Sequence, residues 1–175
     1  MEFNKTAAEL RLPAIGQIGF LAHDIDKTRA CFEKTFGIGP WTVYESRPDS
    51  AIEKSGPVNI KLKVAITYSG PLQIELIEVM EGRCFYNEML DHREGFHHLG
   101  FFVNNIEKRL AECRERNIQL LHRGQIRRRG ITIDYAYLDT AERSMSIIEF
   151  IQIRFGPIPV KMNRLAHRIS ALLRI

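Results

Sequence analysis

The feature that most constrains this chain is an internal repeat. Residues 16–27 read Gly-Gln-Ile-Gly-Phe-Leu-Ala-His-Asp-Ile-Asp-Lys, and residues 97–108 read His-His-Leu-Gly-Phe-Phe-Val-Asn-Asn-Ile-Glu-Lys. At one constant spacing Gln17 corresponds to His98 and Gly19 to Gly100. Each copy is a short run typical of a strand that ends where a helix begins. The chain is therefore expected to contain two similar modules.

A second pair of segments extends the repeat. Residues 73–79, Gln-Ile-Glu-Leu-Ile-Glu-Val, resemble residues 147–153, Ile-Ile-Glu-Phe-Ile-Gln-Ile, and Glu75 corresponds to Glu149. The segment from Gln17 to Glu75 in the first module is longer than the segment from His98 to Glu149 in the second. This difference predicts a longer loop in the first module. The polar segment 47–56 is the candidate for that loop.

The pattern predicts an α+β fold of two tandem β-α-β-β-β modules. Module one is expected over 14–80, a linker with a short helix over 81–94, and module two over 95–155. Asp24 or Asp26 is expected to cap the first helix, and Asn104 or Asn105 the second. Residues 1–13 read as a polar leader, and 156–175 as a tail with a basic amphipathic helix. The expected strands are 15–22, 41–45, 61–67, 72–79, 96–103, 118–123, 131–138 and 145–153, with helices from about 24 to 35, 83–92 and 105–116.

Composition narrows the class of protein. The 175 residues are 45% hydrophobic and 26% charged, as in an ordinary globular protein, and the net charge of +4 is too small to favour nucleic acid. We expect neither a membrane span nor a signal peptide. Cys31, Cys84 and Cys113 follow no zinc or disulfide spacing, so we interpret them as buried thiols in a reducing, cytoplasmic compartment.

Four polar residues occupy corresponding strand positions in the two modules. Because alternate side chains of a strand share a face, Glu149 points with Ile151, an apolar neighbour that makes an unpaired carboxylate costly. Gln17, Glu75, His98 and Glu149, two from each module, are expected to converge where the modules meet. Their oxygen and imidazole donors suit one divalent ion such as Zn, Ni, Co or Mn.

Taken singly, these residues have simpler interpretations. A histidine pair on a strand is usually structural, and a glutamate on a strand usually faces water. Their recurrence in both modules favours a shared site, because independent surface residues have no reason to match. Gly19 and Gly100 are expected to leave room beside it.

These motifs resemble the vicinal oxygen chelate superfamily, which includes glyoxalase I, methylmalonyl-CoA epimerase, bleomycin-resistance proteins and extradiol dioxygenases. The resemblance rests on Gly95-Phe-His-His-Leu-Gly-Phe101, the Gln-Ile-Glu-Leu-Ile-Glu strand and the later Ile-Glu-Phe strand, and it covers about residues 14–155. It implies paired modules that form a cupped, half-closed mixed sheet around one metal.

Carried over by position, the resemblance implies that Gln17, Glu75, His98 and Glu149 are metal ligands. Many relatives have His where this chain has Gln17, but some glyoxalase I enzymes also have Gln. An extradiol dioxygenase is disfavoured, since its iron needs two histidines and one carboxylate. The run Leu62-Lys-Val-Ala-Ile66 is most like the epimerase branch, although Asn59 stands where that branch has a second catalytic glutamate.

The expected function is therefore that of a metal-dependent lyase or isomerase, of the glyoxalase I or acyl-CoA epimerase type. It would move a proton next to a carbonyl of a thioester, hemithioacetal or keto acid, with Glu149 as the base. Asn59, Arg123, Arg127 and Arg129 are candidate substrate-binding residues, although a solvated charge run also explains the arginines. We expect a homodimer.

Two alternatives remain open. One is a non-catalytic protein of the resistance type that sequesters a small molecule in the same cup. The other is a partner-binding module that acts through its basic tail.

Overall fold

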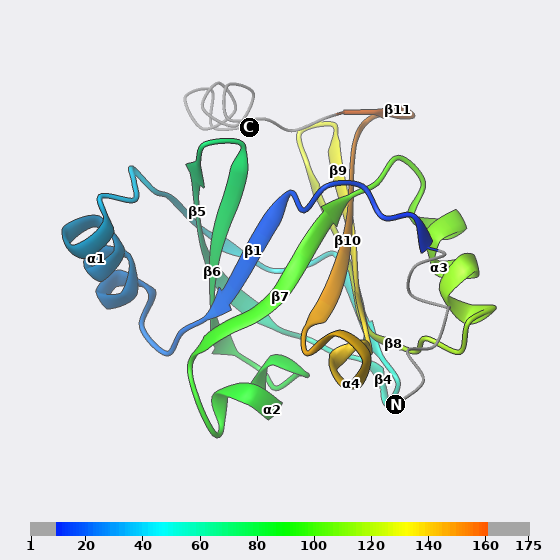
Figure 1. The fold of residues 1–175 in the computed structure, drawn as a ribbon, viewed down its shortest axis with the longest axis horizontal. Helices are drawn as coiled ribbons and strands as arrows, with labels where there is room; N and C mark the ends of the chain where they lie inside the picture. The colour runs from blue at the N-terminus through cyan, green and yellow to red at the C-terminus, as the bar shows by residue number, and fades with distance from the viewer. Residues whose placement is uncertain (1–9, 161–175) are drawn as a thin grey trace.

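Each copy of the first repeat forms a strand that leads directly into a helix. In the computed structural model, which describes residues 10–160, β1 (Gln17–Leu21) precedes α1 (Ile25–Phe36), and β7 (Gly95–Phe102) precedes α3 (Ile106–Arg114) (Figure 1). Asp24 and Asn105 cap the helices, and the side chain of each accepts a hydrogen bond from the backbone N–H three residues later. Such caps satisfy a donor that the helix itself leaves unpaired.

Three further long strands complete each half. They are β2 (Thr42–Ser46), β5 (Lys61–Ser69) and β6 (Leu72–Glu81) in the first half, and β8 (Leu120–Arg128), β9 (Ile131–Leu138) and β10 (Ile147–Phe155) in the second. The short elements are α2 (Tyr86–Leu90), α4 (Ala141–Ser144) and β11 (Ile158–Pro159). Both halves thus have the predicted β-α-β-β-β order, and each contains parallel and antiparallel pairs.

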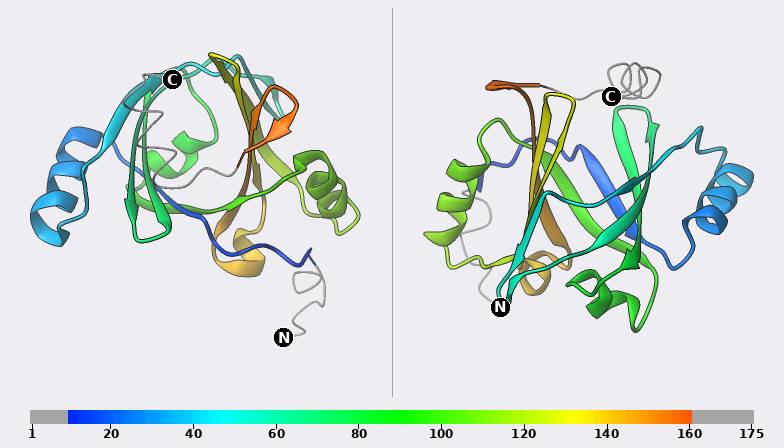
Figure 2. Two further views of the ribbon diagram at one scale, coloured as in Figure 1. Left: turned by 90° about the horizontal axis from the view of Figure 1, so that it is seen from above. Right: turned by 180° about the vertical axis from the view of Figure 1, so that it is seen from behind.

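The two halves join through β1 and β7, which pair antiparallel at the centre of one sheet. Its strand order is β2-β5-β6-β1-β7-β10-β9-β8-β3-β4, in which β3 is Ser50–Glu53 and β4 is Gly56–Pro57, and β11 pairs with β10. Seen from above, the sheet bends round so that its two outer parts face one another (Figure 2). The expected cupped, mixed sheet is confirmed.

The segment between β2 and β5 differs from expectation. Residues 47–56 were predicted as a polar loop, but they include β3 (Ser50–Glu53), and β4 (Gly56–Pro57) follows. β3 pairs with the edge of β8 in the other half, and the Asp49 N–H donates to the Gln125 carbonyl at 2.8 Å. The edge of β8 offers unpaired backbone groups, and β3 satisfies them. This crossing segment, residues 46–53, is called the strap below.

The strand that contains the candidate arginines also differs from the predicted bounds of 118–123. β8 continues through Arg128 and turns at Arg129 and Gly130 into β9. The strand is longer than the predicted 118–123 because β3 on one side and β9 on the other supply partners for its backbone.

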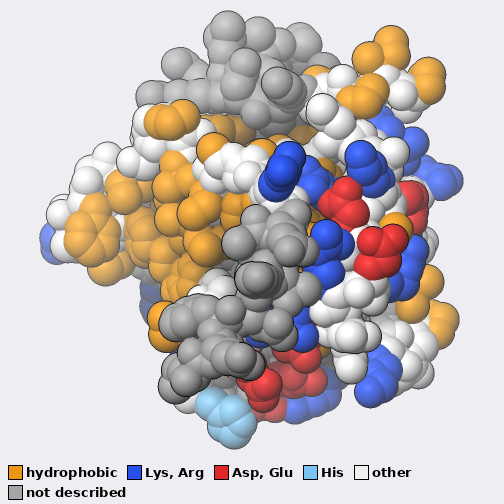
Figure 3. Space-filling view, turned by 45° about the vertical axis from the view of Figure 1, so that its right-hand side comes forward, with side chains coloured by type: hydrophobic (Ala, Val, Ile, Leu, Met, Phe, Trp, Pro, Cys, Tyr) orange, Lys and Arg blue, Asp and Glu red, His pale blue; other side chains and the backbone are white. Residues whose placement is uncertain are grey.

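The helices α1 and α3 pack on the outside of the sheet, at opposite ends of Figure 1. Under α1, Ile25 packs with Ala65 and Leu76, and under α3, Ile106 and Leu110 pack with Phe150. On the right-hand side of the face shown in Figure 3, acidic and basic side chains lie interspersed. Arg109 and Glu112 of α3 form one pair of opposite charges, at 2.8 Å.

Cysteine burial agrees with expectation at two of three positions. Cys84 and Cys113 are buried, and burial raises the pKa of each thiol to about 11. Cys31 is exposed, so its interpretation as a buried thiol was wrong. The reason is that α1 buries only Ile25 fully, and position 31 faces away from the sheet.

The described ends of the chain also pack on the sheet. Leu10, expected in a polar leader, is buried beside α3, and its carbonyl accepts a hydrogen bond from Arg109 at 2.8 Å. The amphipathic helix expected from Lys161 lies outside the described residues, as do residues 1–9. Among the described helices, none has the length and apolar character needed to cross a membrane.

We predict that Asn105→Ala lowers the free energy of unfolding by about 1 kcal/mol, because the Lys108 N–H loses its acceptor. The neighbouring Asn104→Ala is the matched control. Asn104 is equally exposed, and its recorded hydrogen bond uses the backbone carbonyl, which alanine retains. Urea denaturation measures both, and equal losses in the two variants would contradict the cap assignment.

Candidate metal centre

The four predicted ligand residues lie on four adjacent strands. In the β6-β1-β7-β10 register, Gly19 stands between Glu75 and His98. Gly100 stands in the same way between Gln17 and Glu149. Gly19 therefore has a carboxylate and an imidazole beside it, and Gly100 has a carboxylate and an amide, so a similar pattern repeats across the junction between the halves.

The two glycines make this approach sterically possible. A Cβ atom at Gly19 would lie 1.8 Å from Cε1 of His98, and one at Gly100 would lie 2.6 Å from Oε1 of Gln17. Both distances are far inside van der Waals contact. The expectation that these residues leave room beside the site is confirmed, and the room is filled by the side chains of His98 and Gln17.

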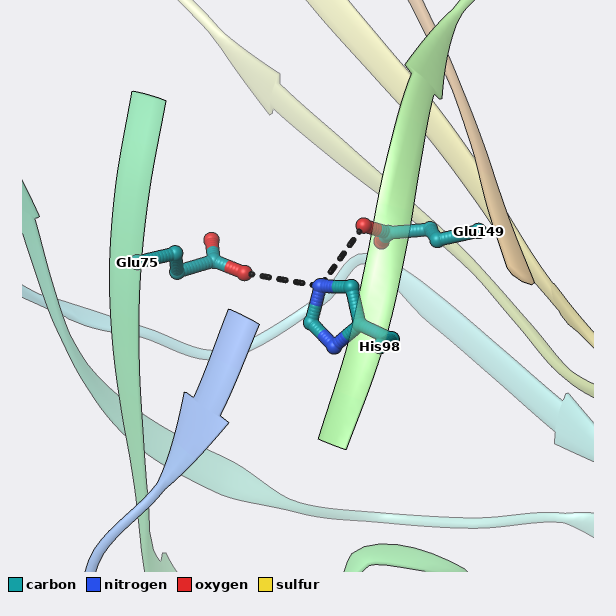
Figure 4. Close-up of side chains that lie close together, drawn as sticks. All are labelled: Glu75, His98 and Glu149. Atoms are coloured by element: carbon teal, nitrogen blue, oxygen red, sulfur yellow. Dashed lines mark ion pairs between the residues drawn. The ribbon is translucent and has the colours of Figure 1, made fainter. Parts of the chain in front are cut away.

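The four side chains converge on one point. Nε2 of His98 lies 3.1 Å from Oε2 of Glu149 and 3.5 Å from Oε2 of Glu75 (Figure 4). Oε1 of Gln17 lies 3.3 Å from the same nitrogen. One imidazole nitrogen carries at most one proton, so it cannot satisfy three oxygens.

The donor set fits a cation. The ligand atoms of Glu75, His98 and Glu149 all lie within 4.8 Å of one another. Oε2 of Glu149 is buried and, despite its closeness to His98, forms no directed hydrogen bond with the described residues. An oxygen left in this state is costly unless a further group binds it. Mixed imidazole, carboxylate and amide donors suit a divalent transition metal.

A chain of hydrogen bonds orients the Gln17 amide. Nε2 of Gln17 donates to Oε1 of Gln73 at 2.8 Å, and Nε2 of Gln73 donates to the Tyr68 hydroxyl at 2.7 Å. With its nitrogen held by Gln73, the amide turns its oxygen towards His98. Sequence reasoning did not give Gln73 this role, although its alternation with Glu75 on β6 places both on one face.

His97 orients His98 from behind. The two Nδ1 atoms lie 3.0 Å apart, so one donates and the other accepts. Burial, with smaller effects from His98 and Arg93, lowers the pKa of His97 to about 2, so this ring is neutral. When Nδ1 of His98 carries the proton and donates to His97, Nε2 faces the carboxylates without one. Such outer partners commonly fix the tautomer of a ligand histidine.

The centre has strong and opposed electrostatic effects. Burial lowers the pKa of His98, but Glu149 and Glu75 outweigh it and raise this pKa to about 9. Burial raises the pKa of Glu149, and His98 opposes that change. Two acidic groups therefore share one positively charged partner. A divalent cation would place more positive charge between them than the single proton of His98 does.

The centre opens into a cavity of about 520 Å³. Gln17, Glu75 and Glu149 lie in its wall, together with Tyr86 and Tyr137. The Tyr86 hydroxyl donates to that of Tyr137 at 3.0 Å, and the Tyr137 ring lies edge-on to His98. The cavity is within the size range of small-molecule sites.

The four candidate substrate-binding residues are not brought together. Arg129 lines the cavity, and so does Arg128, which sequence reasoning missed. Arg123 pairs with Glu107 on α3, and the Arg127 N–H donates to Asp49 in the strap at 2.7 Å. Asn59 accepts a hydrogen bond from Arg47 at 3.0 Å. Asn59, Arg123 and Arg127 are not among the cavity-lining residues.

We predict that Gly19→Ala destabilises the protein, against the usual effect of this substitution. Within a strand, Gly→Ala ordinarily raises stability by about 0.5–1 kcal/mol. Here the added Cβ must displace the buried His98 ring, and such overpacking costs about 1–3 kcal/mol. Denaturant unfolding measures the sign. A more stable Gly19→Ala protein would show that the ring does not lie against this residue.

Comparison with known proteins supports the fold. Among solved structures, a hypothetical protein from Bacillus halodurans has a TM-score of 0.54 at 20% identity, covering 78% of this chain and 91% of its own. A methylmalonyl-CoA epimerase from Mycobacterium tuberculosis has a TM-score of 0.52 at 14% identity, with 80% and 87% covered. A variant of the Streptomyces coelicolor epimerase, in complex with 2-nitronate-propionyl-CoA, has a TM-score of 0.51 at 18% identity, with 80% and 96% covered.

A search of curated proteins found no match. The family model described as the Glyoxalase/Bleomycin resistance protein/Dioxygenase superfamily matches residues 16–137, which is more than half of the chain. This range includes β1, both flanking helices and most of the second half, and the fold agrees with it. The chain belongs to the Glyoxalase/Bleomycin resistance protein/Dioxygenase superfamily, the vicinal oxygen chelate family indicated by its repeated motifs.

Proposed function

We propose that this protein is a metal-dependent lyase or isomerase that moves a proton next to the carbonyl of a small molecule. The observation that carries the proposal is the convergence of Gln17, Glu75, His98 and Glu149 at the wall of a cavity, with Oε2 of Glu149 lacking a directed hydrogen bond. Thioesters, hemithioacetals and keto acids are the substrates whose chemistry fits. A homodimer and a cytoplasmic location stay predictions.

The proposed cofactor is one divalent ion, Zn, Ni, Co or Mn, held by those four residues. When bound, it would act as a Lewis acid towards the substrate carbonyl. The protein contributes the orientation of its donors, because Gln73 holds the Gln17 amide and His97 holds the His98 ring. It also contributes a buried setting, in which the Glu75 side chain is 13% exposed and that of Glu149 is 5% exposed.

Glu149 is the proposed base. Its carboxylate takes the proton from the carbon next to the carbonyl, and the electron pair of that C–H bond moves towards the carbonyl oxygen. Glu149 then returns the proton to a neighbouring atom. Burial raises the pKa of Glu149, which makes the carboxylate a stronger base than an exposed one.

A single base favours proton transfer between neighbouring atoms over inversion at one carbon. Inversion needs a second base on the opposite face. Asn59, an amide, stands where the epimerase branch has that base, and the nearest glutamate before it in the chain is Glu53. Asn59 pairs with Arg47, and Glu53 is held by His122 at 2.9 Å and by the Phe85 N–H at 3.0 Å. Neither lines the cavity.

A second candidate function is non-catalytic capture of a small molecule. The observation that favours it is the apolar character of the cavity away from the metal centre, where isoleucines such as Ile133 and Ile153 form the wall. Such a protein would bind its ligand without exchanging protons.

We predict that the purified protein holds about one equivalent of divalent metal per chain, as expected for a single four-ligand centre. His98→Ala should lower this content, and the Gln17/Glu75/His98/Glu149 quadruple variant should hold none, with circular dichroism to check the fold. His92→Ala, an exposed histidine outside the centre, is the control. Elemental analysis after reconstitution measures the metal content. An unchanged metal content in His98→Ala would contradict the assignment of His98 as a ligand.

We further predict that Glu149→Gln slows proton exchange by at least about 10²-fold, the usual share of a general base. Deuterium uptake from D₂O into a panel of thioesters, hemithioacetals and 2-oxo acids, followed by NMR, measures the rate. Glu33→Gln, on the exposed side of α1, is the control. Exchange at the normal rate in Glu149→Gln would exclude Glu149 as the base. No exchange by the metal-loaded parent would leave ligand capture as the function.

A further inference from the structure

The part of the cavity wall formed by β8, β9 and β10 becomes less polar with distance from the metal centre. At the metal end Glu149 pairs across the strands with Tyr137, and the next pair is Ile151 with Tyr135. The following row is wholly aliphatic, with Ile153 opposite Ile133. Alternate residues of a strand share a face, so these rows follow one another along the cavity.

The row of isoleucines extends over a third strand. Ile126 of β8 pairs with Ile133, so that Ile126, Ile133 and Ile153 stand side by side on β8, β9 and β10. All three line the cavity. Along β10, Ile153 lies four positions beyond Glu149, a length of about 13 Å at the usual rise of a strand.

The wall from the other half is also aliphatic. Ile77 pairs with Val64, and Glu75 pairs with Ile66. Because β6 runs antiparallel to β10, this aliphatic stretch extends from the metal centre in the direction opposite to the isoleucine row. Leu62 also lines the cavity there.

Few residues of this lining are charged. Glu75 and Glu149 belong to the metal centre, and the other charged lining residues are Glu45, Arg128 and Arg129. Arg128 pairs with Ile131, next to the β8–β9 turn and beyond the isoleucine row. Between Glu149 and Arg128 the lining residues of β8, β9 and β10 carry no charge, so a charged ligand body there would lose its hydration without compensation.

One hydroxyl interrupts the apolar wall near the metal end. Tyr135 is 6% exposed, and its hydroxyl has no hydrogen-bond partner among the described residues. Its ring crosses Gly124, where a Cβ would lie 2.2 Å from the Tyr135 ring and hydroxyl. Burial raises the pKa of Tyr135, so the hydroxyl keeps its proton and is available as a donor. A ligand oxygen near the metal end would satisfy it.

We propose that the ligand of this cavity has an oxygen-bearing head at Glu149 and Tyr135 and an extended aliphatic body along the Ile126–Ile133–Ile153 row. The inference rests on the proposed function only in placing the carbonyl at the metal centre. It differs from the acyl groups of the two ligands named for the epimerase structures, methylmalonyl-CoA and the propionyl-CoA analogue, because neither acyl chain is long enough to reach from the metal centre to the isoleucine row.

The test is a binding series of straight-chain 2-oxo acids with four to ten carbons, measured by isothermal titration calorimetry on the metal-loaded protein. Each added methylene that reaches the apolar wall should tighten binding by about three- to fourfold. The affinity should rise steadily over the series. A dissociation constant that does not change with chain length would overturn the inference.

Ile133→Thr supplies the test of the wall, since threonine keeps the branch at Cβ and replaces the ethyl group of isoleucine with a hydroxyl. This substitution should weaken binding of the ten-carbon acid by about five- to tenfold and leave the affinity for the four-carbon acid unchanged. Ile52→Thr is the control, because Ile52 is half exposed on β3 and does not line the cavity. Equal losses for both acids in Ile133→Thr would contradict an aliphatic body at this row.

The same series separates this inference from the proposed function. After removal of the metal by a chelator, the dependence on chain length should persist at lower overall affinity. Normal metal binding without chain-length dependence overturns only the aliphatic ligand. Chain-length dependence in a protein that never holds metal overturns only the metal-dependent enzyme.

Discussion

The antiparallel pairing of β1 with β7 is the contact on which the rest of the molecule depends. It joins the two halves into one sheet and sets a register in which each glycine lies beside a ligand residue from the opposite half. A shift of one residue would place the two polar side chains of one half on the opposite face of the sheet from those of the other half, because side chains alternate. Gly19 and Gly100 resist such a shift, since the His98 ring and the Gln17 amide occupy the space where a Cβ would be.

This register concentrates polar groups in a place that is otherwise apolar. Two carboxylates, an imidazole and an amide are buried or nearly so, and they are surrounded by tyrosines and isoleucines. Burying such groups is unfavourable unless each is compensated. The outer residues Gln73, Tyr68 and His97 compensate the amide and the imidazole. Oε2 of Glu149 forms no directed hydrogen bond and has only the His98 imidazole beside it, and it marks where chemistry is to be expected.

Much of the fold was readable from the sequence because the repeat is local. Strand alternation and helix caps depend on neighbouring residues, and Glu75 was matched with Glu149 through the short motifs around each. These patterns predicted the two modules and the four converging side chains. The pairing of β3 with β8 was not readable. It joins segments far apart in the chain through backbone hydrogen bonds, which no side-chain pattern records. The roles of Gln73 and Arg128 were missed for a related reason, since both follow from which strands are neighbours.

The strap has a consequence for how the cavity is assembled. The hairpins β5–β6 and β8–β9 join residues close in sequence, whereas β3 and β8 bring together Ser50 and Gln125. Closing so long a loop has a high entropic cost, so such a pairing forms after the local hairpins that it connects. The β8 edge of the cavity is therefore completed late in folding, when both halves are already in place. Neither half contains a ligand cavity alone, and the pocket is a property of the whole chain.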